Sequence, residues 1–207
     1  MTREYNLNTK QARSAEASRI DSTGAYTGSI TQAFAIRSSK GSDGIELSFK
    51  ADNGSTADYL SLYTHNAKGE ELRGLKVLNS LMAVLKLREL KPARGKIKTR
   101  VDGQLVDAEG DVFPSLCARV GLVLQREEYV KNDGSLGSRM ALFLPFCAET
   151  KRVASEILDQ KPQGEALHKI VGNLKDRPAQ APKARTAQPT AGGGTSTGDF
   201  EDDDIPF

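Results

Sequence analysis

Residues 26–37, with the sequence YTGSITQAFAIR, alternate side chains of different size with a period of two. Tyr26, Ile30, Phe34 and Ile36 fall on one side of this alternation, while threonine, serine and alanine residues predominate on the other. A period of two is the spacing of a β-strand that buries one face. The stretch therefore predicts a strand that is long enough to bend.

Two further alternating stretches follow, and turns containing glycine separate them. Residues 45–50 alternate apolar and polar side chains after a turn at residues 38–44, and residues 59–63 do the same after the turn Asp52-Asn53-Gly54. The spacing then becomes helical, with a stripe of leucine and methionine residues from Leu75 to Leu85. Three strands and one helix are thus expected in this order.

Two more strands are predicted at residues 116–131 and 140–146, joined by the hairpin turn Asn132-Asp133-Gly134. Residues 149–160 and 164–175 have the spacing of two short helices. Three strands, a helix and two strands is the order expected of a five-stranded oligonucleotide-binding (OB) barrel, so we predict a mainly β fold of this kind. A barrel without a nucleic-acid role is the alternative, because fold alone does not specify function.

The composition fits one globular domain and a tail. The chain has 207 residues, of which 38% are hydrophobic and 27% charged. We expect a polar arm at 1–22, the OB barrel at 23–175, a disordered Pro- and Gly-containing linker at 176–198 and an acidic tip at 199–207. Residues 177–207 carry three cations and five carboxylates, so the net charge of +2 leaves +4 on residues 1–176. Such a balance is compatible with a polyanionic partner.

The residues of common catalytic motifs are scarce in this sequence. His65 and His168 are its only histidines, and no metal-ligand spacing, phosphate-binding loop or nucleophile elbow is present. We therefore expect a protein that is not an enzyme and uses no cofactor or metal. Cys117 and Cys147 lie in apolar runs and are expected to be small buried side chains. With no apolar stretch long enough to cross a bilayer, the expected localisation is cytoplasmic.

The segment 199–207, DFEDDDIPF, is a run of carboxylates followed directly by an apolar tripeptide. The ring of Phe207 can enter an apolar pocket of a partner while its terminal carboxylate meets a basic side chain. The carboxylates can lie along a cationic rim, and Pro206 lowers the ordering cost of docking. This segment is therefore expected to bind a partner rather than the barrel's own core.

The string DDDIPF resembles the tail of bacterial single-stranded DNA-binding proteins, and the Gly-rich stretch before it resembles their linker. The barrel region differs from the usual bacterial type, which favours a phage or prophage version. The resemblance implies an OB fold and a tip that is bound by replication, recombination and repair enzymes. The residues that carry this expectation are Asp202, Asp203, Asp204, Ile205, Pro206 and Phe207.

Binding of single strands requires cations for the phosphates and exposed aromatic rings for the bases. If Leu60 and Leu62 face the core, Tyr59 and Tyr63 lie on the outer face of their strand, and Tyr129 is a third aromatic candidate. The candidate phosphate-binding residues include cations on the predicted outer faces of strands: Arg37, Lys50, Arg119, Arg126 and Lys131. The densest basic cluster comprises Lys86, Arg88, Lys91, Arg94, Lys96, Lys98 and Arg100, which Glu89 alone opposes within that stretch. A solvated helix end is the alternative interpretation of this cluster.

These observations predict a single-stranded DNA-binding protein that coats DNA and recruits enzymes through its tip, and we expect it to form a homo-oligomer. The alternative is an adaptor or decoy that captures tip-binding host enzymes without coating DNA. A strand-coating protein requires Tyr59, Tyr63 and the cluster from Lys86 to Arg100 to share one face, and an adaptor does not. A strand-annealing protein is a third reading, which the sequence leaves open.

Overall fold

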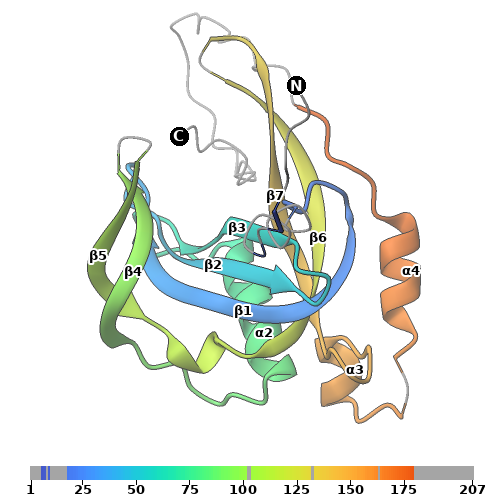
Figure 1. The fold of residues 1–207 in the computed structure, drawn as a ribbon. Helices are drawn as coiled ribbons and strands as arrows, with labels where there is room; N and C mark the ends of the chain where they lie inside the picture. The colour runs from blue at the N-terminus through green and yellow to red at the C-terminus, as the bar shows by residue number, and fades with distance from the viewer. Residues whose placement is uncertain are drawn as a thin grey trace, which may run out of the picture.

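Seven antiparallel strands form one sheet in the computed structural model (Figure 1), which describes residues 6, 7, 9, 18–101, 104–131, 133–162 and 164–179. The strands are β1 (Gly24–Arg37), β2 (Asp43–Ala51), β3 (Thr56–His65), β4 (Ala93–Val101), β5 (Gln104–Val112), β6 (Arg119–Val130) and β7 (Leu136–Phe146). The helices are α2 (Arg73–Val84), α3 (Ala154–Leu158) and α4 (Ala166–Asn173), and Pro114–Leu116 form a short 3-10 turn. The predicted mainly β class is confirmed.

Strand β1 joins the two halves of the sheet. One edge of β1 pairs with β2, which in turn pairs with β3. The other edge pairs with β6 along Gly24–Ser29 and meets β5 farther on, where Phe34 lies opposite Val112. Strand β6 continues into a long hairpin with β7. Because β1 is curved, it can pair with β6 at one end and with β5 at the other (Figure 1).

A β-bulge in β1 changes the faces that simple alternation predicts. Ile30 lies opposite Phe49 and Gln32 lies opposite Ser48, so Thr31 is the extra residue. Ile30 and Ala33 therefore both belong to the main core, although they are three positions apart. Phe34 is buried as predicted, but it is not part of that core cluster. The bulge turns Phe34 toward the opposite face of the sheet.

The hairpin β4–β5 corrects the predicted count of five strands. Residues 93–101, which include part of the predicted basic cluster, were not predicted as a strand, but they pair with residues 104–112 along an unbroken antiparallel ladder. The alternation in β4 is present in the sequence, since cations alternate with Gly95, Ile97 and Thr99. Ile97 is the only large apolar side chain among them that is buried, so the hydrophobic signal for a strand is weak.

The core lies between the sheet and α2. Helix α2 buries Val77, Leu78, Leu81 and Val84, which follow one another at the spacing of a single helix face. Leu81 is fully buried, and burying such a side chain stabilises a fold by roughly 1.5–3 kcal/mol. The predicted helix is confirmed, and it begins two residues earlier than its apolar stripe.

A second, smaller core cluster lies beneath α4. It consists of Val123, Phe146 and Val153, and side chains of α4 pack against it. The two short helices predicted near the end of the described chain are thus present as α3 and α4. Cys117 is exposed and Cys147 is partly buried, contrary to the expectation for Cys117, because Leu116 takes the buried position at the 3-10 turn. Among the described residues, no helix is long and apolar enough to span a bilayer.

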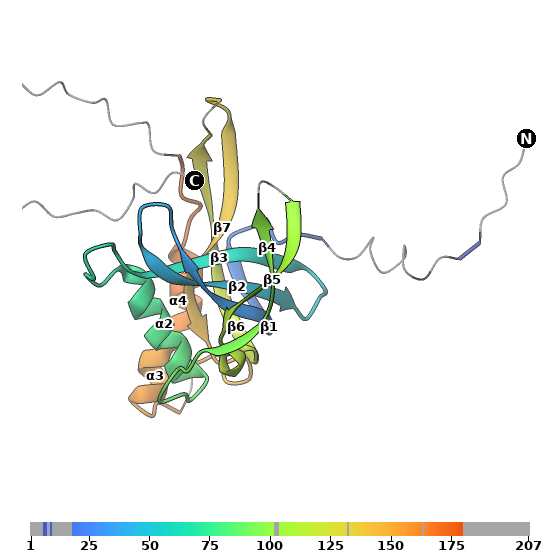
Figure 2. The ribbon, with the colours of Figure 1, turned by 90° about the vertical axis from the view of Figure 1, so that its left-hand side faces the viewer.

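Both long hairpins extend beyond the layer formed by β1, β2 and β3, and they do so toward the same end of the molecule (Figures 1 and 2). The side chain of Gln32 on β1 binds the backbone of β4 partway along the β4–β5 hairpin. Its Nε2 donates to the carbonyl oxygen of Lys98 at 3.0 Å, and its Oε1 accepts from the Lys98 backbone N–H at 3.1 Å. The hairpin is therefore attached to β1 by side-chain bonds as well as by the bridge to β5.

Candidate nucleic-acid interface

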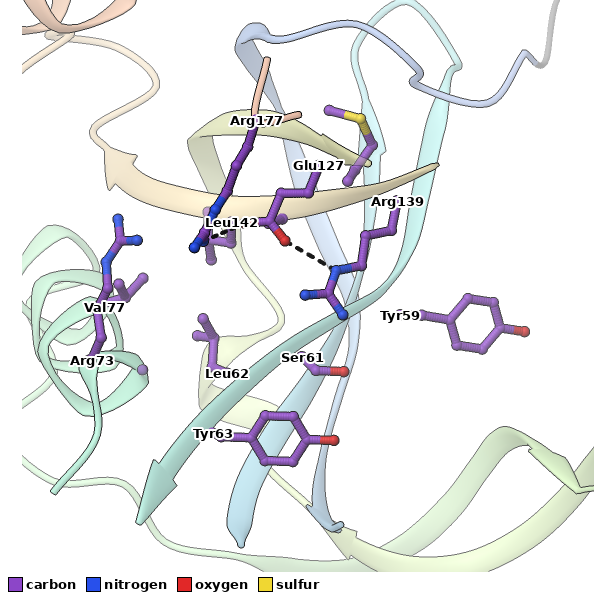
Figure 3. A pocket seen from close by; sticks show the side chains of 13 residues that line it. Tyr59, Ser61, Leu62, Tyr63, Arg73, Val77, Glu127, Arg139, Leu142 and Arg177 are labelled. Carbon is purple, nitrogen blue, oxygen red and sulfur yellow. Dashed lines mark hydrogen bonds and ion pairs between the residues drawn. The ribbon is translucent and has the colours of Figure 1, made fainter. Parts of the chain in front are cut away.

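A cavity of about 220 Å³ lies between β3, the first turn of α2 and the β6–β7 hairpin (Figure 3). Strands β3 and β7 belong to the same sheet, but no ladder joins them among the described residues. The cavity occupies this opening. Its lining residues are Tyr59, Ser61, Leu62, Tyr63, Arg73, Gly74, Val77, Glu127, Arg139, Met140, Ala141, Leu142 and Arg177.

Strand β3 contributes Tyr59, Ser61 and Tyr63 to the lining of the cavity. Tyr59, Ser61 and Tyr63 project toward the same side (Figure 3), while Leu60 and Leu62 are buried in the core, as predicted. A bulge lies between β2 and β3 where Leu47 and Phe49 face Leu60 and Ala57, and Tyr59 has a φ of 62° there. A left-handed backbone at a tyrosine is uncommon and costs roughly 1–2 kcal/mol, so the surrounding ladder must hold it.

The phenol of Tyr63 remains neutral far above neutral pH. Partial burial raises the pKa of Tyr63, the carboxylate of Glu46 raises it further, and Arg139 opposes both effects. Glu46 on β2 lies opposite Ser61 on β3. Burial is also the main cause of the raised pKa of Glu46. A neutral phenol can donate a hydrogen bond and offers an uncharged ring on which a base can stack.

Helix α2 approaches β3 very closely at the edge of the cavity. A Cβ atom on Gly74 would lie 2.1 Å from the carbonyl oxygen of Tyr63, so only glycine permits this contact. The neighbouring Arg73 is thereby placed at the rim, and its guanidinium lies 5.1 Å from the ring centroid of Phe143 on β7. This cation–π contact orients a positive charge next to the opening.

The β6–β7 wall carries one carboxylate between two arginines. Glu127 Oε2 accepts a hydrogen bond from Arg139 Nε at 3.0 Å, and Glu127 Oε1 lies 3.5 Å from Arg177 Nη1 (Figure 3). Arg177 follows α4 and is fixed to β6 by its backbone, which donates to the carbonyl oxygen of Arg126 and accepts from the N–H of Glu128. With Arg73, the described lining residues include three arginines and one carboxylate, a net charge of +2.

Tyr129 extends the aromatic surface beyond the cavity. In the β6–β7 ladder Tyr129 lies opposite Gly137 and Glu127 lies opposite Arg139, so all four positions are on one face of the hairpin. A Cβ atom on Gly137 would be 2.6 Å from Cζ of Tyr129, which means that the ring lies over this glycine. Tyr129 is 36% exposed. The hairpin face that lines the cavity therefore continues into an accessible ring.

The predicted basic cluster lies elsewhere. Lys86, Arg88 and Lys91 are exposed between α2 and β4, and Lys91 pairs with Glu89 at 2.7 Å. Further along, Arg94, Lys96 and Lys98 are exposed on one face of β4, and the side chain of Arg100 lies outside what the structure describes. Among these cations, those whose side chains the structure describes are absent from the cavity lining.

Acidic residues on β5 face the cations of β4 directly. Asp111 lies opposite Arg94, with 3.4 Å between Nε and Oδ1, while Glu109 lies opposite Lys96 and Asp107 opposite Lys98. Opposite charges on facing positions of an antiparallel ladder attract one another. The cluster is therefore less positive in the fold than its local sequence indicates.

Most of the remaining predicted cations also have acidic neighbours. Arg119 donates to both carboxylate oxygens of Asp52 at 2.7 and 2.9 Å, and these bonds are the main cause of the lowered pKa of Asp52. Arg37 pairs with Asp43, and Arg126 lies near Glu128 and Asp176. Lys50 and Lys131 are exposed. Phosphate binding by the paired arginines would have to compete with these carboxylates.

Sequence reasoning missed the three arginines of the cavity. The fifth strand was predicted to begin at Met140, so Arg139 lay just outside it, and Arg177 was assigned to the linker. Extending the alternation of β7 back to Leu136 would have placed Gly137, Arg139 and Ala141 on one face. No local signal distinguishes Arg73 or Arg177, because contacts with distant segments bring them to the cavity.

The predicted partner-binding residues, Asp202, Asp203, Asp204, Ile205, Pro206 and Phe207, lie outside the described residues. Within the described part of the chain, no group of histidine, cysteine or acidic side chains could hold a metal ion. Comparison with models of known protein families gave no match, and comparison with curated proteins gave none either. The fold, the cavity and the sequence are therefore the grounds for assigning a function to this protein.

Proposed function

We propose that this chain is a single-stranded DNA-binding protein that coats exposed strands and recruits replication, recombination and repair enzymes through residues 199–207. The observation that carries the proposal is the cavity, whose lining includes two tyrosines, Tyr59 and Tyr63, and three arginines, Arg73, Arg139 and Arg177. Aromatic rings that stack on bases, together with cations that follow the backbone, are the two requirements for binding single strands.

An OB barrel with an inserted hairpin is the fold that we propose for this function. Without β4 and β5, the elements follow the order strand, strand, strand, helix, strand, strand. In addition, β1 pairs with both β2 and β6, which brings the first and fourth strands of that order together. The opening between β3 and β7 then corresponds to the open part of a partly closed barrel.

The size and lining of the cavity favour a single strand over a duplex. Pockets for drug-sized ligands measure about 300–1,000 Å³, so a smaller cavity suits a group such as one base or one phosphate. A base can enter only if it is not stacked inside a double helix. Tyr129 offers a further ring for a neighbouring base, on the face of the β6–β7 hairpin that carries Glu127 and Arg139. A strand with splayed bases fits this arrangement better than paired DNA.

The acidic tip supplies the second half of the proposal. Its likeness to the tails of bacterial single-stranded DNA-binding proteins is the ground for assigning it to enzyme recruitment. Phe207→Ala should abolish partner binding and leave strand binding nearly unchanged, measured by pull-down of a tip-binding bacterial helicase or exonuclease and by oligo-dT titration. Loss of strand binding in this variant would show that the tip is not a separate recruiting element.

One structural observation favours the adaptor as the second candidate. The cations of β4 face Asp107, Glu109 and Asp111, and they do not line the cavity with Tyr59 and Tyr63. An extended phosphate-binding surface is therefore smaller than the sequence predicts. An adaptor that carries the acidic tip would not need such a surface.

Titration of labelled oligo-dT distinguishes the two candidates. Full-length protein and a form that ends at residue 179 are compared at low and moderate salt, with duplex DNA as competitor. Tight, salt-sensitive binding that prefers the single strand is expected, and the shorter form should bind more tightly at low salt because it lacks the acidic segment. Absence of binding by both forms would overturn the coating function and leave the adaptor.

A further inference from the structure

Glu127 is the only carboxylate among the described residues that line the cavity, and it lies between two arginines from different segments. Arg139 comes from β7, and Arg177 comes from the segment that follows α4. The two cation–carboxylate distances are 3.0 and 3.5 Å, and each arginine meets a different oxygen of Glu127. One anion thus holds two guanidinium groups at the same place.

The exposure of the three side chains is unequal. The side chain of Glu127 is 13% exposed, whereas those of Arg139 and Arg177 are 49% and 36% exposed. The side chain of Glu127 is therefore largely covered, whereas both arginine side chains keep part of their surface in solvent. A second anion can reach these arginine side chains more readily than it can reach Glu127.

We propose that Arg139 and Arg177 form a binding subsite for one phosphodiester group of the strand, and that Glu127 occupies this subsite as an internal anion. This inference rests on the proposed function and assigns its phosphate contact. Guanidinium groups match the geometry of phosphate oxygens as well as that of carboxylates. A strand phosphate therefore competes with Glu127 for the same donors, and Glu127 lowers the affinity for DNA while it keeps both arginines in place.

The adjacent Glu128 provides a matched control. It lies opposite Ser138 and thus on the other face of the hairpin, where its nearest ion pair is with Arg126 at 3.6 Å. Glu127→Gln and Glu128→Gln remove the same charge from consecutive positions of one strand. Only the first change removes the anion from between Arg139 and Arg177, so a general effect of net charge is separated from a local one.

The experiment titrates full-length Glu127→Gln, Glu128→Gln and unaltered protein with oligo-dT, oligo-dC and oligo-dA across a range of salt concentrations. Glu127→Gln should bind all three about tenfold more tightly at low salt, and its log–log salt dependence should steepen by about 0.7. Glu128→Gln should change affinity by less than about threefold. Thermal unfolding of each variant verifies that the fold is retained.

A double-mutant cycle with Arg139→Gln tests whether Glu127 acts through this arginine. Arg139→Gln alone should weaken binding, and Glu127→Gln should give little further gain in that background. This second measurement remains informative if Glu127→Gln also lowers the unfolding temperature, because the cycle is read from affinities of folded protein.

The outcomes separate this inference from the proposed function. Unchanged affinity of Glu127→Gln, beside normal binding by the unaltered protein, would overturn the phosphate subsite alone. A gain or loss confined to one oligonucleotide would overturn it as well, because it would show that Glu127 contacts a base. Failure of the unaltered protein to bind any oligonucleotide would overturn the proposed function itself.

Discussion

Arg94 on β4 faces Asp111 on β5 across an antiparallel ladder, with 3.4 Å between Nε and Oδ1. The same ladder places Lys96 opposite Glu109 and Lys98 opposite Asp107. A run of cations at 94–98, prominent in the sequence, is thereby set against a run of carboxylates at 107–111. The carboxylates of β5 partly balance the positive charge of β4. Among the described residues that line the cavity, only Glu127 opposes the charge of the three arginines.

The first prediction compares these two sets of cations. The double variant Lys96→Gln/Lys98→Gln should weaken oligo-dT binding by less than about threefold, because cross-strand acids already reduce the field of β4. Arg139→Gln should weaken binding by about tenfold, as expected for the loss of one charge-assisted phosphate contact. Fluorescence anisotropy measures both. A loss in the lysine variant equal to that in Arg139→Gln would indicate that the strand passes over β4.

The second prediction concerns Tyr129 and uses the absence of tryptophan from the chain. Tyr129→Trp should give a fluorescence signal that oligo-dT strongly quenches, because a base stacks on the ring at this position. Leu136→Trp is the control, since Leu136 pairs with Val130 on the opposite face of the same hairpin and is exposed. Its signal should change little. Equal quenching at both positions would place the strand at the hairpin tip rather than along the cavity face.

The third prediction concerns the close approach of α2 to β3. Gly74→Ala places a methyl group 2.1 Å from the carbonyl oxygen of Tyr63, so the helix must shift and the cavity must widen. We expect a loss of roughly 1–3 kcal/mol in the free energy of unfolding, with weaker strand binding. Gly172→Ala in α4 is the control, because its new methyl group meets nothing within 4 Å. Urea unfolding should show this second variant to be as stable as the unaltered protein or up to about 1 kcal/mol more stable.

The fourth prediction concerns the buried carboxylate of Glu156. Burial alone would raise the pKa of Glu156, but hydrogen bonds from the backbone N–H groups of Ala166, Val153 and Glu165 outweigh it, and the pKa is lowered. A lowered folded-state pKa gives stability that is complete above the ordinary glutamate pKa and is lost as pH falls through the folded value. Glu156→Gln retains fewer acceptor sites and should cost roughly 1–3 kcal/mol at neutral pH.

Urea unfolding between about pH 3 and pH 7 tests this prediction, because the difference between the two proteins should shrink on the acid side. Glu165→Gln is the control, since Glu165 is exposed and contributes its backbone N–H to this network. A constant difference across the whole pH range would mean that Glu156 stabilises the fold by packing rather than by its charge.

Much of the architecture follows from local sequence patterns. Alternation in residues 26–37, 45–50 and 59–63 predicted β1, β2 and β3, and the leucine stripe predicted α2. The hairpin turn at residues 132–134 predicted the pairing of β6 with β7, although β7 begins four residues before the predicted start. The hairpin β4–β5 was missed because its alternating residues are mostly charged or small, and such a pattern resembles that of a solvated loop.

The candidate site was predicted only in part, because bulges and register are not visible in a local pattern. Tyr59, Tyr63 and Tyr129 were identified from alternation and the need for stacking surfaces, and they lie at or beside the cavity. The cations were assigned from local density, which does not indicate the acids that a neighbouring strand places opposite them. Arg139 was excluded by an error of a few residues in a strand boundary.

By itself, the sequence determined a mainly β fold with a helix after its third strand, and it supplied the acidic segment 199–207 on which the recruitment proposal depends. The tertiary structure alone decided which charges remain available: it pairs Arg94 with Asp111 and gathers Arg73, Arg139 and Arg177 around one cavity. The physical reason is that periodicity reports which face a side chain takes within its own strand or helix. Its partners across the ladder depend on register, and register depends on bulges and long-range packing.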